Sequence, residues 1–167
     1  MSSPVDTHER LYDLLKDFDT AMLVTHGGGG GKMHARPMGV AELTADGNAC
    51  FVTHVDSPKA AAIRANAAVT LSFQSARQFA SVSGTATVVQ DPALVERLWS
   101  ETWKVWFPQG KSDPAIAMIK FTAQEAEYWD SAGTEGLKFV FDSVKAYLTG
   151  QTPPSDETQN AKVQLPG

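Results

Sequence analysis

Cysteine is scarce in this sequence of 167 residues, and its scarcity limits the kinds of site that the chain can form. The single thiol, Cys50, has no partner for an internal disulfide, and one thiol excludes most metal sites built from thiolates. Histidine offers no substitute, because His26, His34 and His54 lack the i, i+4 spacing that makes a helical metal pair specific. We therefore expect no metal site. One free thiol is also compatible with a reducing cytosol.

Long apolar runs and blocks of basic residues are also missing. No segment approaches the roughly 20 apolar residues that a membrane-spanning helix requires, and the first residues, MSSPVDTHERL, are polar rather than typical of a signal peptide. The net charge is −5 and the pI is near 5.3, which disfavours a surface for nucleic acid or for an anionic membrane. We expect a cytoplasmic protein that binds neither.

The sequence also lacks a phosphate-binding loop of the nucleotide-hydrolase type, although five consecutive glycines precede Lys32. Such a loop needs a Gly, four further residues and then Gly-Lys-Ser/Thr, so that backbone amides wrap the phosphates. Here His26 stands at the first glycine position and Met33 at the hydroxyl position. The glycines therefore predict a flexible hairpin tip between two strands, TAMLVTH and HARPMGVAEL.

What the chain does have is apolar content for one domain, since 43% of its residues are hydrophobic. We place this domain at 1–150, followed by a polar tail at 151–167 that is either mobile or an arm over another surface. Strands are predicted over 20–26, 34–44, 49–55, 68–74, 79–90 and 115–131, and helices over 6–18, 57–66 and 91–107. The last helix is expected to turn Leu94, Leu98 and Val105 inward, and 137–150 fits a strand or, as we prefer, a closing helix. Closely spaced strands with one helical crossover favour an antiparallel sheet that curls or closes.

The most informative segment is FVTHVDSPKAAAIRAN, residues 51–66, where a strand leads into a helix. Ser57 is a good N-cap, Pro58 suits the first helical position, and Lys59 projects from the first turn. A lysine there opposes the helix dipole, which indicates either a bound anion or an ordinary capped helix with a solvated side chain. Arg36, on a neighbouring strand, can hold a phosphate by two parallel hydrogen bonds if it converges with Lys59.

The order of these segments resembles a known family. A helix, a strand, a glycine turn, an RPM strand, the corner F-x-T-x-x-x-S-x-K, a strand with Phe, and SGTATVV before an Asp-initiated helix follow one another as in the split barrels that bind flavin mononucleotide (FMN). Those proteins include pyridoxamine 5′-phosphate oxidases and general stress proteins. The likeness covers about residues 6–130, and WKVWFPQGKSDP with the later EYWD is similar to the general stress protein branch. It implies a mainly β fold with peripheral helices, a split β-barrel of six or seven mostly antiparallel strands, and a homodimer with FMN at the subunit interface.

The resemblance also implies which residues hold the cofactor. Carried over position by position, Arg36, Ser57 and Lys59 hold the phosphate, while Pro37, Met38, Val52 and Thr53 border the isoalloxazine ring with backbone polar groups. Gln78, or its neighbour Phe79, corresponds to the glutamine that reaches the flavin in the oxidases. Trp106 or Phe107 lies beside the flavin of the partner subunit. The alternative for the aromatic residues Trp99, Trp103, Trp106, Phe107 and Trp129 is packing in the core and in a dimer interface.

Departures from the oxidases argue against vitamin B6 oxidase activity. Ala41 stands where the oxidases carry a strand lysine, and Pro58 stands where they carry an arginine before the corner lysine. No Arg or His follows Arg97, so the Arg-x-His segment that helps bind pyridoxal is missing. The main hypothesis is an FMN-binding, stress-related protein with a reductase role and no evident catalytic side chain. The alternatives are a non-catalytic flavin store or sensor, and a split barrel that binds haem or a deazaflavin. The sequence does not distinguish FMN from FAD.

Overall fold

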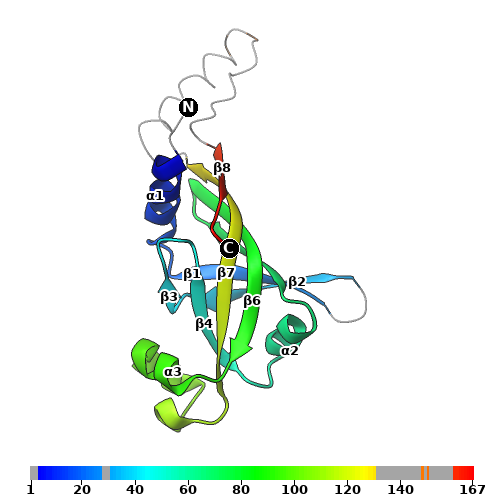
Figure 1. Ribbon diagram of the computed structural model, residues 1–167, viewed down its shortest axis with the longest axis vertical. Helices are drawn as coiled ribbons and strands as arrows, with labels where there is room; N and C mark the ends of the chain where they lie inside the picture. Colours follow the sequence, from blue (N-terminus) through cyan, green and yellow to red (C-terminus); the bar gives the residue numbers. More distant parts are fainter. Residues whose placement is uncertain (1–3, 28–30, 131–147, 149, 151–159) are drawn as a thin grey trace.

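The computed structural model describes residues 4–27, 31–130, 148, 150 and 160–167. Its centre is a curled sheet with the strand order β2-β1-β5-β6-β7-β4-β3, to which β8 adds by pairing with β7 (Figure 1). The strands are β1 (Thr20–His26), β2 (Met33–Gly39), β3 (Glu42–Leu43), β4 (Ala49–His54), β5 (Ala68–Gln74), β6 (Gln78–Val89), β7 (Ile116–Asp130) and β8 (Asn160–Gln164). The helices are α1 (Pro4–Leu15), α2 (Pro58–Ala65) and α3 (Pro92–Leu98), with the 3₁₀ turns η1 (Glu101–Val105) and η2 (Gly110–Ser112).

This sheet is a split β-barrel in which every described strand pair is antiparallel. The seven strands of the main path confirm the expected mainly β fold with peripheral helices. The predicted strand over 34–44 is divided, because the chain leaves β1 after Gly39. The amide of Val40 donates to the carbonyl of Asp19, and the amide of Ala41 donates to the carbonyl of Cys50. The chain thereby passes from one edge of the sheet to β3 and β4.

The glycine run joins β1 and β2, as predicted. The two strands pair from Thr20↔Gly39 to His26↔Met33, and the amide of Gly27 donates to the carbonyl of Lys32 at 2.6 Å. A side chain at Gly27 would meet that carbonyl at 2.7 Å, so this position requires glycine. Residues 28–30 lie outside the described part of the chain.

The long strand β7 connects the two ends of the molecule. Its first half, Ile116–Phe121, pairs with β4, and its second half pairs along the same edge with β8. The prediction of a mobile or overlying tail is therefore wrong for Asn160–Gln164, where Val163 is buried in the core. Strand β7 carries a bulge at Gln124, opposite Ser83 and Gly84 of β6, because Ser83 pairs with Glu125 whereas Gly84 pairs with Ala123. The segment 137–150, predicted as a closing helix, lies almost wholly outside the described residues.

Two apolar clusters stabilise the fold. The larger fills the barrel and includes Leu11, Leu14 and Leu15 of α1, which packs near β8 at one end of the long strands (Figure 1). The smaller lies at the other end, where α3 and η1 cover β4 and the start of β7. It includes Val95 of α3, Trp103 of η1, Phe107, and Met118 of β7. Within the described ranges, no helix is both long and apolar enough to cross a membrane. The smaller cluster supports the wall of the site described next.

Candidate functional site

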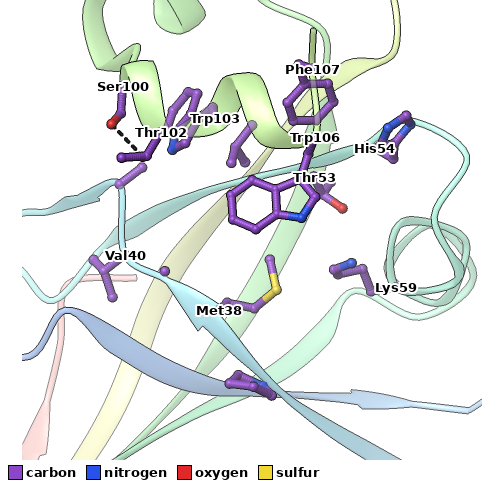
Figure 2. A pocket seen from close by; sticks show the side chains of 14 residues that line it. Met38, Val40, Thr53, His54, Lys59, Ser100, Thr102, Trp103, Trp106 and Phe107 are labelled. Carbon is purple, nitrogen blue, oxygen red and sulfur yellow. Dashed lines mark hydrogen bonds between the residues drawn. The ribbon is translucent and has the colours of Figure 1, made fainter.

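A cavity of about 560 Å³ lies where β2, β4, the start of α2 and the η1 turn meet. Its lining is largely apolar, with few charged groups, which is typical of sites for small molecules (Figure 2). The residues that line it are Pro37, Met38, Gly39, Val40, Ala41, Val52, Thr53, His54, Lys59, Ser100, Thr102, Trp103, Trp106 and Phe107. The structure thus brings Pro37, Met38, Val52, Thr53, Lys59, Trp106 and Phe107, all predicted from the sequence, into one cavity.

One wall comes from β2, the first strand of the sheet order. Pro37 has no amide proton to donate, and an edge strand tolerates that loss. Its exposed ring lines the cavity, whereas the next side chain, Met38, is buried beneath it. Pro37 therefore offers the cavity a rigid ring, and Met38 offers it a polarisable thioether.

A second wall comes from the corner between β4 and α2. Val52 and Thr53 pair with Met118 and Ala117 of β7, which holds the end of β4 in place. Ser57 caps α2, since its hydroxyl accepts from the amide of Ala60 at 3.2 Å. The hydroxyls of Thr53 and Ser57 lie 2.9 Å apart and are both buried. This internal hydrogen bonding fixes the first turn of α2 and hence the position from which Lys59 projects.

Two positive charges converge at this corner. The pKa of Lys59 is lowered, first by burial and second by the charge of Arg36. Burial also lowers the pKa of Arg36, whose Nη1 donates to Thr25 Oγ1 at 2.7 Å and to the carbonyl of Leu23 at 3.4 Å. Among the residues that the structure describes, neither cation takes part in a salt bridge. An anion at this corner would relieve their mutual repulsion and favour the charged form of Lys59.

The remaining wall comes from α3 and η1, where the predicted helix over 91–107 is wrong in part. Asp91 and Pro92 begin α3 as expected, but the helix ends at Leu98, and Trp99 has an extended ψ of 133°. The side chain of Trp99 donates to Glu101, and the hydroxyls of Ser100 and Thr102 lie 2.8 Å apart. These local bonds favour a new 3₁₀ turn, η1, over continuation of the α-helix.

The break changes which aromatic side chains are buried. Val105, expected on the inner side, is 78% exposed, whereas Trp103 and Phe107 fill the smaller apolar cluster. Phe107 stacks on His54 with ring centroids 4.9 Å apart, and Trp103 meets Trp99 edge to face. Two hydrogen-bonded side chains, Arg97 and Glu42, tie α3 to β3 across the sheet edge. The wall over the cavity is therefore fixed at several points.

Gln78 and Phe79 do not line this cavity. Gln78 begins β6 and donates to Asp130 Oδ1 at 3.3 Å, at the end of β7 opposite the half that pairs with β4. Neither residue approaches the cavity within one chain. Arg36 and Ser57 stand at the corner behind the lining rather than in it.

Sequence reasoning missed several lining residues. Gly39, Val40 and Ala41 simply continue the RPM strand, so their place could have been read from the chain order. His54 follows Thr53 at the strand end, where the sequence raises only the role of a metal ligand for it, which the spacing of the histidines disfavours. Ser100 and Thr102 carry no sequence signal for the cavity, because their position depends on the break after α3. Within the described ranges, no group of three His, Cys, Asp or Glu side chains is placed to hold a metal ion.

The sequence of this chain is similar to a known family and to a curated relative. Residues 6–154 match the family model described as pyridoxamine 5′-phosphate oxidase like. The curated relative bli-3 of Neurospora crassa is 28% identical over 142 residues, which cover 78% of this chain and 68% of that protein.

Solved structures of stress proteins share the fold. A general stress protein 26 from Jannaschia sp. CCS1 has a TM-score of 0.72 and 25% identity, covering 98% of this chain and 100% of that one. A general stress family protein from Xanthomonas campestris is 32% identical with a TM-score of 0.66, covering 80% of this chain and 93% of that one. The general stress FMN/FAD binding protein of Xanthomonas citri is 33% identical with a TM-score of 0.64, covering 76% and 90%.

Proposed function

This chain belongs to the pyridoxamine 5′-phosphate oxidase-like family, in its general stress protein branch, and from that premise we propose that it binds FMN in the cavity between β2, β4, α2 and η1. The observation that carries the proposal is that Lys59 lines a largely apolar cavity while the charge of Arg36 acts on it from behind that lining. A ligand that suits both features has a planar apolar part and an anionic group. FMN has both.

The residues present fit a flavin phosphate. Lys59 and Arg36 supply two cationic donors. The guanidinium of Arg36 is already held by Thr25, so it loses little conformational freedom when a ligand binds. Ser57 contributes differently from the sequence-based expectation. Its hydroxyl has one proton, so it can donate to a phosphate oxygen only when Thr53 donates to Ser57. We therefore assign Ser57 mainly to holding the corner and Lys59 with Arg36 to holding the charge.

The rest of the cavity fits the ring. Pro37, Met38, Val52 and Thr53 border the space with backbone polar groups and apolar side chains, and Trp106 with Phe107 closes it from η1. When bound, FMN supplies hydride or electron transfer, while the protein supplies binding, orientation and exclusion of water. Only two titratable side chains, His54 and Lys59, are among the lining residues. A reductase role therefore rests on the cofactor rather than on a side-chain acid or base.

The same scarcity of titratable groups supports the second candidate, a flavin store or sensor without turnover. The two candidates differ in one measurable property, which is reduction of the bound flavin by NADH or NADPH without oxygen. Bleaching of the flavin absorbance at a saturable rate supports the reductase, and an unchanged spectrum supports the store.

We also propose that the chain acts as a homodimer with the cofactor at the subunit interface. Met22 is exposed on β1 directly opposite the cavity residue Pro37, so an apolar strip continues from the cavity onto the outer face of the sheet. Phe79 and Trp129 are paired across β6 and β7 and are also partly exposed. A second copy over this face would cover apolar area. It would also bring Gln78 or Phe79 toward a site that neither reaches within one chain.

The binding proposal is tested by the absorption spectrum of the purified protein and by calorimetric titration with FMN and riboflavin. We expect a flavin spectrum and tighter binding of FMN than of riboflavin, because the phosphate is the part that the two cations hold. Equal affinities would contradict the phosphate site. A haem or deazaflavin spectrum would replace FMN with another planar cofactor.

A further inference from the structure

Trp106 combines exposure to solvent with a place in the lining of the cavity. It is 61% exposed, yet it lines the cavity that the proposed ligand would fill. Figure 2 shows its indole projecting from the η1 turn toward Met38, with Lys59 beside the same space. A large apolar side chain held in water at the mouth of a cavity has area to bury only when something enters.

The backbone turn that carries Trp106 is held in place by hydrogen bonds and by the packing of its neighbours. The amides of Trp106 and Phe107 both donate to the carbonyl of Trp103, at 3.0 and 2.9 Å. The side chains of Trp103 and Phe107 are 8% and 2% exposed and anchor the turn in the smaller apolar cluster. Trp103 and Phe107 thus pack in the smaller apolar cluster, and the side chain of Trp106 remains available for contact with a ligand.

We infer that Trp106 is a ring-stacking residue that covers the face of a planar ligand turned away from Met38, and that it does so in the same chain whose Lys59 holds the phosphate. This inference rests on the proposed function and assigns the aromatic contact to this subunit, whereas the family resemblance implied the partner. Stacking on an aromatic side chain acts on the ring alone. It should therefore contribute equally to the binding of flavins with and without a phosphate.

The test is calorimetric titration of the wild-type protein, Trp106→Ala, Trp106→Phe and Val105→Ala with FMN and with riboflavin. Val105 is the matched control, because it lies on the same turn, is more exposed and does not line the cavity. We expect Trp106→Ala to bind both flavins about tenfold more weakly, leaving the ratio of the two affinities unchanged. Trp106→Phe should recover most of the loss, and Val105→Ala should bind as the wild type does.

A second measurement is independent of affinity. An indole stacked on a flavin quenches its fluorescence by donating an electron to the excited ring, so flavin bound to Trp106→Ala should emit more strongly than flavin bound to the wild type or to Val105→Ala. Thermal unfolding of the four proteins without ligand should be similar, because Trp106 is not packed in a core.

If Trp106→Ala instead binds both flavins as the wild type does, with the same emission, the stacking role is overturned. A loss confined to FMN would also overturn it, because it would place Trp106 at the phosphate. If the wild-type protein binds neither flavin, the proposed function fails, and this inference is overturned with it.

Discussion

The pKa of Lys59, in the first turn of α2, is lowered first by burial and second by the charge of Arg36 on strand β2. The two cations belong to separate elements: Lys59 lines the cavity, and Arg36 stands behind the lining, where its charge acts on Lys59. Such an arrangement is unfavourable by itself, since burial also disfavours the charged form of both groups. A bound anion would make it favourable.

The pH dependence of binding follows from this pair. A bound phosphate favours the ammonium form of Lys59 and therefore raises its pKa. When the pH exceeds the lowered pKa of Lys59 in the ligand-free protein, Lys59 must take up a proton for FMN to bind. FMN affinity should therefore be constant near neutral pH and fall as the pH rises through that lowered pKa. Titrations above pH 7, where the phosphate is a dianion, check this, and Lys59→Met should abolish the fall. A fall of the same size for riboflavin would contradict the assignment.

The same pKa shift predicts a change in stability without ligand. The pKa of Lys59 is lower in the folded than in the unfolded chain, so its charge destabilises the fold at pH values below the folded pKa. This destabilisation is relieved as the pH rises toward the unfolded pKa. Lys59→Met should therefore raise the free energy of unfolding at pH 7, measured by urea denaturation, and the gain should shrink at alkaline pH. Lys32→Met, at an exposed position, is the control and should show no such pH-dependent gain.

Gly84 should tolerate no side chain. A Cβ there would lie 1.9 Å from the carbonyl oxygen of Thr122, at the bulge between β6 and β7. Gly84→Ala must shift one of the two strands that hold the barrel together, and we expect a loss of about 2 to 4 kcal/mol in the free energy of unfolding. Gly39→Ala is the matched control, because a Cβ at Gly39 would meet no atom within 4 Å. Similar stabilities of the two variants at one protein concentration would show that the bulge can relax.

The proposed homodimer is tested by light scattering at micromolar concentration with FMN bound. We expect a mass twice the 17.9 kDa of the chain. Met22→Lys, on the exposed apolar strip beside Pro37, should weaken the association, because it places a charge where apolar area would be covered. A mass near that of one chain for the wild-type protein would contradict the dimer.

Much of the fold could be predicted from the sequence, because local patterns determine it. The alternation of apolar residues located β1 and β5 to the residue, and Ser57 with Pro58 marked the start of α2. Strand β8 was missed although Ala161, Val163 and Leu165 alternate with Lys162 and Gln164, because this short pattern lies in a polar tail and the strand forms only through pairing with β7. The break after Leu98 was missed because the helical spacing of apolar residues continues across it.

The candidate site was predictable where its signals are local and not where they depend on the curl of the sheet. The helix start and the cation at Lys59 are encoded in consecutive residues, whereas the approach of Arg36 depends on how β2 curves over β4 and α2. Gln78 shows the opposite case. Its position in the chain order suggested the flavin, but the length of β6 carries it to the far end of the sheet.

The central claim is that Lys59 and Arg36 hold a phosphate while the glycine run does not. Calorimetry should compare the wild-type protein with Lys59→Ala, Arg36→Ala and Lys32→Ala, using FMN and riboflavin. Lys59→Ala and Arg36→Ala should each remove a charge-assisted hydrogen bond of about 1.5 to 3 kcal/mol, which weakens FMN binding about ten- to a hundredfold. Arg36→Ala also needs a thermal unfolding control, since Thr25 Oγ1 is buried and loses its donor.

In the predicted result, both variants lose much more affinity for FMN than for riboflavin, and Lys32→Ala binds both flavins as the wild type does. If Lys32→Ala proves the most damaging of the three, the glycine run is a phosphate cradle and the site assigned to Arg36 and Lys59 is wrong.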